Sequence, residues 1–419
     1  MNIYISILLW ITYLLSLYFS LFFFLVFLDM RTTHPSRCFR LSRFPIITII
    51  IPAYNEEETI IDALRSVLAL HYPKDKLDVI VIDDGSTDKT AEKLRAFIAD
   101  KPHVTLISHP NMGKAASLNA ALTHARGEFF SCLDADSFVE PHALHDMLAL
   151  YFSRNDPEIA IITPALKVKS PRNILQRVQW IEYLVMVLVS RLASRIDCLY
   201  VAPGPFSLYR TSLVCDLGGF DEHTLTEDQE IAYRMQLHHY RIIQCPTAFV
   251  HTLAPATLGA FYRQRRRWYK GSLSCLHQYK KLILNKRYGD FGFIQMLKNF
   301  LGFLIAVSGM FFVFYFIVLP IFNRIYNLSI IGFDFWPYLQ HLTFSFNILS
   351  IDIEKVFIVG VLFLISFVFF YAAHRNASER FTAVGWIPVI PYFFLYYLVK
   401  GSILLFSLAE YSINKKQKW

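Results

Sequence analysis

The sequence has few charged residues and many apolar ones. Of its 419 residues, 18% are charged and 54% are hydrophobic, and the mean hydropathy is +0.37. Soluble globular proteins carry about 25% charged residues, so this composition excludes an ordinary soluble enzyme. The formal net charge of +8 fits contact with anionic lipid headgroups. No basic arm or nucleic-acid motif accompanies that charge, so we expect no nucleic-acid partner.

Cysteine is also scarce, and it lacks the spacing that metal sites and disulfide frameworks use. None of the six cysteines forms a CxxC pair. They are Cys38, Cys132, Cys198, Cys215, Cys245 and Cys275. We therefore expect reduced, packed thiols in a cytosolic domain. No internal repeat or low-complexity tract is present.

A long apolar run opens the chain, from Ile3 to Leu28. It supplies the ~20 residues that a helix needs to cross a bilayer. No basic segment precedes it and no small-residue cleavage site ends it, so a cleaved signal peptide is not expected. Four arginines follow closely, which by the positive-inside rule puts the chain from residue 31 onward in the cytoplasm. They are Arg31, Arg37, Arg40 and Arg43.

Beyond residue 285 the apolar runs return. Three membrane spans are predicted at Phe300–Ile321, Val356–Tyr371 and Trp386–Leu408, and a weaker fourth at Leu328–Ile351. The weaker one contains polar residues and fits an interfacial or re-entrant segment equally well. Four spans would keep the lysines near the end of the sequence inside, which slightly favours four over three.

The chain between these regions alternates short apolar runs with helical patterns. Strands are predicted at 46–51, 79–82, 104–107 and 128–133, and helices at 56–70, 87–99 and 115–125. Strands alternating with helices indicate a mostly parallel, doubly wound sheet. In such sheets the ligand lies beyond the carboxyl ends of the strands, and polar motifs follow three of these strands.

Two of those motifs are acidic. Asp134-Ala135-Asp136 offers two carboxylates that can share a hard divalent cation bridging a diphosphate, although a surface turn explains the spacing alone equally well. Asp83-Asp84-Gly85-Ser86 can accept hydrogen bonds from a nucleobase or ribose. The same residues suit a turn in which Ser86 or Thr87 caps the next helix, and both roles are compatible.

Lys114 stands at a predicted helix start, in Asn111-Met112-Gly113-Lys114. There it could neutralise a nucleotide phosphate, and the alternative is a solvated lysine.

Thr226-Glu227-Asp228 is the candidate catalytic segment. Displacement of a nucleoside diphosphate by a sugar hydroxyl needs one base, and Asp228 is the candidate. The structural alternative is strong: Thr226 would cap the helix 229–237, and both acids would favour its positive end.

A basic and aromatic stretch follows at 263–269. Helical spacing places Gln264, Arg267 and Trp268 mostly on one side and leaves Arg265 and Arg266 for other surfaces. Trp268 could stack on a sugar ring and Arg267 could hold a diphosphate. The alternative is an amphipathic helix at lipid headgroups.

Taken together, these motifs resemble those of processive family 2 glycosyltransferases of membranes, which include cellulose, chitin, hyaluronan and poly-N-acetylglucosamine synthases. The similarity covers about residues 45–280. It rests on Pro52-Ala53-Tyr54-Asn55-Glu56, the motifs at 83–86, 111–114, 134–136 and 226–228, and Gln264-Arg265-Arg266-Arg267-Trp268. The size and layout are most similar to bacterial poly-β-1,6-N-acetylglucosamine synthases.

The resemblance implies an α/β GT-A (Rossmann-like) glycosyltransferase domain inserted between transmembrane helices. It implies an inverting transfer from a UDP-sugar, with Mg²⁺ or Mn²⁺ as cofactor. The domains expected are a transmembrane helix at 1–30, the GT-A domain at 45–285 and a membrane region at 290–410.

The resemblance also implies roles for residues. The residues expected to bind the donor are Pro52, Tyr54, Glu56, Asp84, Lys114 and Asp134. Asp136 is expected to bind the metal. Asp228 is the base, with Glu227 beside it, and Gln264, Arg267 and Trp268 form the acceptor and diphosphate clamp. Gly204-Pro205-Phe206 corresponds to acceptor-channel residues.

We therefore expect a multi-pass protein of the cell membrane with a cytoplasmic catalytic domain. It would use UDP-N-acetylglucosamine to elongate a polysaccharide and pass it across the membrane. The alternative is transfer of one sugar to a lipid or short acceptor. A catalytically dead scaffold is disfavoured because Asp134, Asp136 and Asp228 are all present. Expected partners are the donor, the growing polysaccharide or lipid acceptor, membrane lipid and an accessory membrane subunit.

Overall fold

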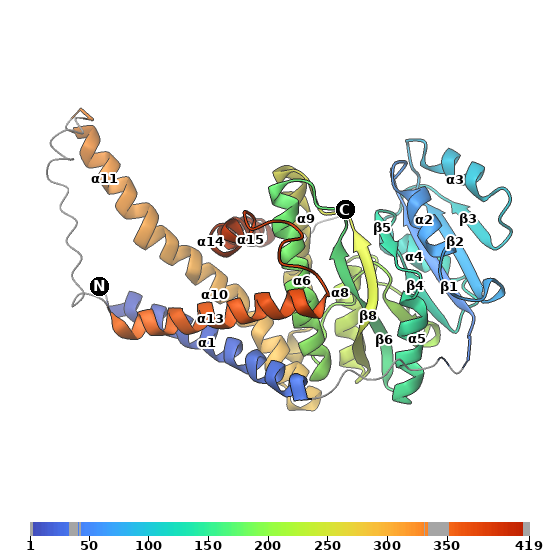
Figure 1. The fold of residues 1–419 in the computed structure, drawn as a ribbon, viewed down its shortest axis with the longest axis horizontal. Coiled ribbons are helices and arrows are strands. Elements are labelled where there is room, and N and C mark those ends of the chain that lie inside the picture. The colour runs from blue at the N-terminus through green and yellow to red at the C-terminus, as the bar shows by residue number, and fades with distance from the viewer. Residues whose placement is uncertain (1–2, 33–40, 42, 331, 334–351, 414–419) are drawn as a thin grey trace.

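An α/β domain occupies one end of the molecule and long helices occupy the other (Figure 1). The computed structural model describes residues 3–32, 41, 43–330, 332–333 and 352–413. Two helices, α6 (Ile174–Arg195) and α9 (Leu258–Gln278), lie where the two parts meet. The active-site segments predicted from the sequence all belong to the α/β part or to α9.

The domain is built on one eight-stranded sheet, in the order β3-β2-β1-β4-β7-β6-β8-β5. The strands are β1 Ile47–Ala53, β2 Leu77–Asp83, β3 Val104–Ser108, β4 Phe129–Cys132, β5 Ser137–Val139, β6 Ile159–Val168, β7 Leu208–Arg210 and β8 Arg241–Thr252. Strands β1 to β4 are mutually parallel, as predicted. The sheet beyond β4 is mixed, because β7 runs antiparallel to β4 and β6, and β5 antiparallel to β8.

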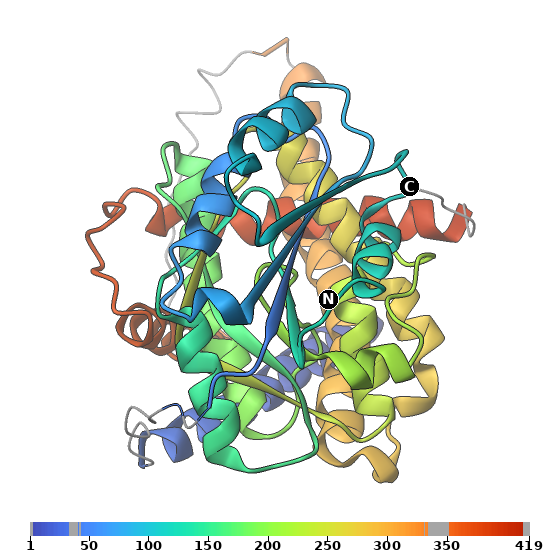
Figure 2. The same ribbon diagram turned by 90° about the vertical axis from the view of Figure 1, so that its right-hand side faces the viewer.

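Helices lie on both sides of the sheet, as Figure 2 shows from the side. They are α2 Ile60–Leu68, α3 Thr90–Ile98, α4 Lys114–Leu122, α5 Ala143–Arg154, α7 Thr211–Asp216 and α8 Glu227–Leu237, together with α6 and α9. Alternate residues of β1 enter separate cores: Ile49 and Ile51 join one hydrophobic cluster and Ile50 joins the other. A strand covered on both faces is apolar at most positions, which explains the run Ile46–Ile51. Its one polar residue, Thr48, is buried and donates a hydrogen bond to Asp78 Oδ2 (3.0 Å).

The predicted helix 56–70 begins later than the sequence indicated, at Ile60. Asn55 adopts a left-handed backbone (φ 54°). The backbone N–H groups of Asn55 and Glu56 donate to the side chains of Ser86 (3.0 Å) and Thr90 (2.9 Å). These bonds to the segment after β2 replace the first turn of a helix and hold the two loops together.

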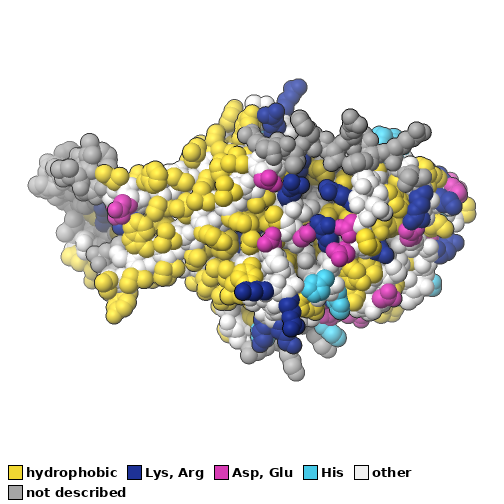
Figure 3. Space-filling model, turned by 90° about the horizontal axis from the view of Figure 1, so that it is seen from below, with side chains coloured by type: hydrophobic (Ala, Val, Ile, Leu, Met, Phe, Trp, Pro, Cys, Tyr) yellow, Lys and Arg dark blue, Asp and Glu magenta, His cyan; other side chains and the backbone are white. Residues whose placement is uncertain are grey.

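Three helices among the described residues are long and apolar enough to cross a membrane: Ile3–Met30, Phe291–Ile330 and Ile353–Asn376. The first lies in α1 (Ile3–Thr32) and the third is α13. The second joins α10 (Leu297–Val313) and α11 (Leu319–Ile330) through the π-helical segments η4 (Phe291–Met296) and η5 (Phe314–Val318). Its 40 residues extend roughly 60 Å, about twice the thickness of a bilayer's hydrocarbon core. Figure 3 shows hydrophobic side chains gathered over this end of the molecule.

The region predicted as the span Trp386–Leu408 is not one continuous helix. It divides into α14 (Val389–Phe394) and α15 (Tyr396–Ile413). Pro388 and Pro391 lack backbone N–H donors and therefore suit the start of a helix, and α14 begins between them at Val389 and ends before Leu395. The helix α15 packs against α9, and Glu410 near its end pairs with Arg266 (2.6 Å). The weaker candidate Leu328–Ile351 lies almost entirely outside the described residues.

The membrane helices pack on the domain through a cluster of aromatic and aliphatic side chains. Phe23 and Phe27 of α1 meet residues of α6, α9 and α13 there. The five cysteines that the structure describes are unbonded thiols, and four of them are buried. Those described cysteines agree with the expectation of reduced, packed thiols.

Candidate active site

The predicted motifs meet at one edge of the sheet because β1, β2 and β4 are parallel neighbours. The loop after β2 begins beside the end of β1, where Asp84 N–H donates to Ala53 O (2.9 Å), and the loop after β4 begins three residues earlier along β1, where Leu133 N–H donates to Ile50 O (2.9 Å). This is the edge at which doubly wound sheets bind ligands.

The loop after β1 presents the residues predicted to bind uridine. Asn55 accepts hydrogen bonds from Thr87 N–H (2.8 Å) and Thr87 Oγ1 (3.2 Å), which fixes the turn. Pro52 precedes the turn at half-burial, and Tyr54 stands beside it with 49% of its surface exposed. The Tyr54 ring is thus open to stack on a ligand.

Asp84 is buried and already engaged. Its carboxylate accepts from Met112 N–H (2.8 Å) and Gly113 N–H (3.0 Å), and His109 Nδ1 lies 3.3 Å away. In this structure Asp84 therefore anchors the segment that leads into Lys114. Its predicted contact with uridine stays a prediction.

Lys114, the first residue of α4, lies between two carboxylates. Its Nζ is 2.7 Å from Asp134 Oδ1 and 2.8 Å from Glu227 Oε1. Burial alone would lower the pKa of Lys114, but Asp134 and Glu227 raise it well above the usual value. The lysine therefore ties the loop after β4 to the start of α8, and the solvated alternative does not hold.

Gly204 closes over this ion pair. A Cβ at this position would lie 2.9 Å from Lys114 Nζ and 3.4 Å from an Asp134 oxygen. Any side chain would enter the space beside the charged groups, so glycine keeps that space open to a ligand.

Asp136 is the predicted metal ligand, and its surroundings suit a cation. Burial, followed by the charges of the nearby Asp134 and Glu56 carboxylates, raises the pKa of Asp136 to about 7. Excess negative charge on hard oxygen ligands is what Mg²⁺ or Mn²⁺ would neutralise. No group of three His, Cys, Asp or Glu side chains among the described residues is arranged to hold a metal. A cation here would thus need ligands from a diphosphate and water as well, as is usual for Mg²⁺.

Glu227 and Asp228 begin α8 and differ in acidity. Burial, followed by the charge of Glu227, raises the pKa of Asp228 to about 6. Burial also acts to raise the pKa of Glu227, but Lys114 and then Arg267 hold it below the usual value. Two adjacent carboxylates with separated pKa values suit different tasks, and Asp228 is the one that can exchange a proton near neutral pH. Thr226 stands at the helix start but makes no capping hydrogen bond through its side chain, contrary to the structural alternative.

The helix α9 carries the clamp residues past the start of α8. Arg267 Nη1 donates to Leu225 O (3.4 Å), just before Thr226. Gly271, one turn further, meets Thr226 so closely that a Cβ would lie 2.3 Å from Thr226 Oγ1. The Gln264 side-chain oxygen is buried and has no hydrogen-bond partner among the described residues, which leaves it available to a ligand hydroxyl.

The other face of α9 is occupied as predicted for Arg265 and Arg266. Arg265 is buried against Glu182 of α6 (2.5 Å), and its guanidinium carbon lies 4.2 Å from the centre of the Trp268 ring. Trp268, which was predicted on the side of Gln264 and Arg267, therefore lies against Arg265 instead. Glu182 also pairs with Lys400 of α15 (2.6 Å). Burial would raise the pKa of Glu182, but Lys400 and Arg265 hold it below its usual value. Sequence reasoning missed Glu182, although a single carboxylate inside the apolar run Val178–Leu188 was a signal.

Comparison with known proteins identifies the domain that holds these residues. A family model described as "Glycosyl transferase family 2" matches residues 48–215. This stretch is a family 2 glycosyltransferase domain. The match includes the loops with Tyr54, Asp84, Lys114 and Asp134, and it ends before α8 and α9.

Two curated relatives of this chain carry the same name. The poly-beta-1,6-N-acetyl-D-glucosamine synthase of Staphylococcus aureus strain COL is 34% identical over 226 residues, which are 54% of this chain and 54% of the relative. The synthase of Staphylococcus epidermidis is 32% identical over the same shares. The chain thus spans about half the length of the curated relatives it matches.

A solved structure matches the fold over nearly the whole chain. A mannosyltransferase from Pyrobaculum calidifontis, in complex with GDP-Man and Mn²⁺, superposes with a TM-score of 0.62. Its sequence is 19% identical, and 99% of each chain is covered. The predicted GT-A fold of the family 2 domain is confirmed.

Proposed function

We propose that this chain is a membrane-bound, inverting glycosyltransferase that takes a sugar from a UDP-sugar, with UDP-N-acetylglucosamine as donor, and adds it to a growing polysaccharide. One observation carries the proposal most: Asp228, half-buried and with a pKa of about 6, lies beside the Lys114–Glu227 and Lys114–Asp134 ion pairs. The names of the curated relatives support N-acetylglucosamine as the sugar.

The reaction needs little beyond position and charge. Asp228 takes the proton of the acceptor hydroxyl, whose oxygen bonds to C1 of the donor sugar while the bond from C1 to UDP breaks. Attack opposite the leaving group turns an α-linked donor into a β-linked product. Arg267 and Lys114 are placed to offset the charge of the departing diphosphate.

Asp136 and Asp134 would hold Mg²⁺ or Mn²⁺, which would neutralise charge on the diphosphate. The Mn²⁺ in the mannosyltransferase complex supports a divalent ion without selecting between the two. The apolar helices support a site at the membrane. The arginines that follow the first apolar run support a cytoplasmic position for the domain, because positive residues next to a span favour the cytoplasmic side. Passage of the polymer through the helices and an accessory subunit belong to the same proposal.

The test is incorporation of labelled sugar by the purified protein in lipid nanodiscs. UDP-N-acetylglucosamine, UDP-glucose and UDP-glucuronate are supplied separately with Mg²⁺ or Mn²⁺, and the product is sized. A ladder or long product from UDP-N-acetylglucosamine alone is expected. A single addition would replace elongation with transfer to a short or lipid acceptor, and turnover only with another donor would refute the choice of sugar.

A further inference from the structure

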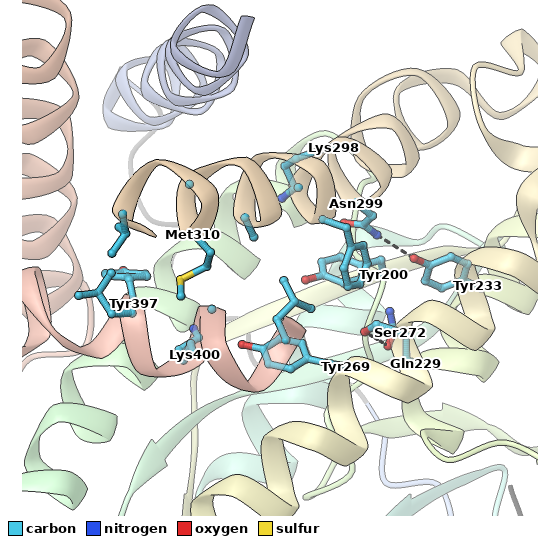
Figure 4. A pocket seen from close by; sticks show the side chains of 18 residues that line it. Tyr200, Gln229, Tyr233, Tyr269, Ser272, Lys298, Asn299, Met310, Tyr397 and Lys400 are labelled. Atoms are coloured by element: carbon cyan, nitrogen blue, oxygen red, sulfur yellow. Dashed lines mark hydrogen bonds between the residues drawn. The ribbon is translucent and has the colours of Figure 1, made fainter. Parts of the chain in front are cut away.

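A cavity of about 590 Å³ lies between the start of the catalytic helices and the membrane helices, and the proposed reaction leaves it unused. Residues of α8, α9, α10 and α15 line it (Figure 4). Its volume is in the range of small-molecule sites. Because α10 belongs to a candidate span, the cavity adjoins the depth at which lipid would meet the protein.

One end of the cavity is polar and adjoins the catalytic residues. Gln229, which follows Asp228 directly, lines it and accepts a hydrogen bond from Ser272 (2.7 Å). Tyr269, which follows Trp268, lines it as well. A ligand with its polar group at this end would therefore reach toward the base.

Lys298 makes this end positive. It lies on α10, 4.5 Å over the Phe23 ring and 5.8 Å over the Tyr200 ring, and no described carboxylate comes within salt-bridge distance of it. Lys400 of α15 lies across the cavity, beside Met310, and pairs there with Glu182 (2.6 Å). The charge of Lys298 is therefore not offset by a described carboxylate, and such a site favours an anion.

The rest of the cavity is apolar along the membrane helix. Its wall is formed by Gly302, Phe303, Ala306, Met310 and Val313 of α10, with Leu404 of α15. From 302 to 313 this wall runs roughly 16 Å along the helix axis. A glycan would find few hydrogen-bond partners for its hydroxyl groups there, whereas a hydrocarbon chain has no hydrogen bonds to lose.

We propose that this cavity holds a lipid-linked sugar acceptor: its phosphate lies near Lys298, its hydrocarbon chain lies along α10, and its sugar hydroxyl faces Asp228. The assignment rests on the proposed glycosyl transfer and names the acceptor for it. An anionic head above an apolar tail matches the charge and the lining of the cavity from one end to the other.

The first test is direct binding to the full-length protein in nanodiscs. The probe is N-acetylglucosamine joined through a diphosphate to a labelled dodecyl chain. It is expected to bind saturably, with inorganic phosphate and dodecanol each at least tenfold weaker as competitors. Equal competition by phosphatidylglycerol would overturn the assignment, because the cavity would then hold ordinary phospholipid.

Two variants separate the head from the tail. Lys298→Gln is expected to weaken probe binding about tenfold to a hundredfold, because it removes the positive charge that lies beside the phosphate. Gly309→Leu also lowers binding: Gly309 lines the cavity, and a Cβ there meets nothing within 4 Å, so leucine fills the space for the chain. The matched controls are Lys286→Gln, an exposed lysine outside the cavity, and Gly360→Leu, an equally open glycine of α13.

Turnover then separates this assignment from the proposed function. Both variants are expected to raise the KM for the lipid-linked acceptor at least tenfold more than the KM for a soluble chito-oligosaccharide. Equal effects on the two acceptors, or unchanged probe binding in both variants, would refute the lipid site while transfer itself stands. Tight probe binding without transfer from any UDP-sugar would instead refute the proposed function.

Discussion

Replacing Gly271 by alanine tests whether the contact between α8 and α9 sets the geometry of the site. The added Cβ would lie 2.3 Å from Thr226 Oγ1 and 2.4 Å from Thr226 Cγ2. Ordinary contacts begin at 3.4 Å, so the helices must separate by about 1 Å. Arg267 and Trp268 lie one turn earlier on α9 and move with it.

A misplacement of about 1 Å lowers turnover on the order of 100-fold when reacting groups are held by position. Overpacking also destabilises a core by about 1–3 kcal/mol. We therefore expect Gly271→Ala to lose most of its kcat, with a smaller change in the KM for the donor, because the donor loops lie on other elements. UDP release in nanodiscs measures the first, and thermal unfolding followed by tryptophan fluorescence measures the second.

The control is Gly259→Ala in the first turn of the same helix, where the nearest atom to the new Cβ is Arg263 Nη1 at 3.7 Å. It should keep its activity and gain up to about 1 kcal/mol from helix propensity. The double variant Gly271→Ala with Thr226→Gly removes the clashing side chain and should recover turnover to within about tenfold of Thr226→Gly alone. Wild-type kcat in Gly271→Ala, or no recovery in the double variant, would refute the packing argument.

Three further outcomes follow from the charges in the site. Asp228 must be ionised to act as base, and its pKa is raised to about 6, so kcat/KM should be constant above that pH and fall about tenfold per unit below it; a rate unchanged from pH 7 to 5 would exclude Asp228. Glu182→Gln leaves Arg265 and Lys400 facing each other without a counter-charge, and we expect a loss of about 3–5 kcal/mol in unfolding free energy, measured by denaturant titration. Asp136→Asn should weaken Mn²⁺ binding at least tenfold in equilibrium dialysis with UDP present; unchanged binding would remove Asp136 as a ligand.

Much of the fold could be predicted because the sequences of buried parallel strands are runs of apolar residues. The runs at 46–51 and 79–82 became β1 and β2, and their carboxyl ends carry the polar motifs. The antiparallel strand β7 has only three residues and depends on pairing with a distant segment, so no local sequence pattern predicted it. The break between α14 and α15 falls at Leu395, an apolar residue, so hydropathy gave no signal for it.

The candidate site could be predicted as a set of motifs but not as a set of partners. Spacing and resemblance pointed to Lys114, Asp134 and Glu227, but not to their pairing: Lys114 binds Asp134, 20 residues away, and also Glu227, 113 residues away. The direction of the Asp228 pKa depends on burial and on Glu227, which only the folded chain specifies. The same holds for Lys298, whose place in a cavity beside α9 follows from helix packing rather than from its neighbours in sequence.

The most direct test of the central claim is the configuration of the first glycosidic bond that the protein makes. The purified protein receives UDP-N-acetylglucosamine, Mn²⁺ and an acceptor, and NMR assigns the anomeric proton of the product. Transfer assisted by Asp228 alone predicts a β-linked product from wild type and none from Asp228→Asn, while the exposed Asp216→Asn behaves as wild type. An α-linked product, or β-linked product at the wild-type rate from Asp228→Asn, would contradict the account.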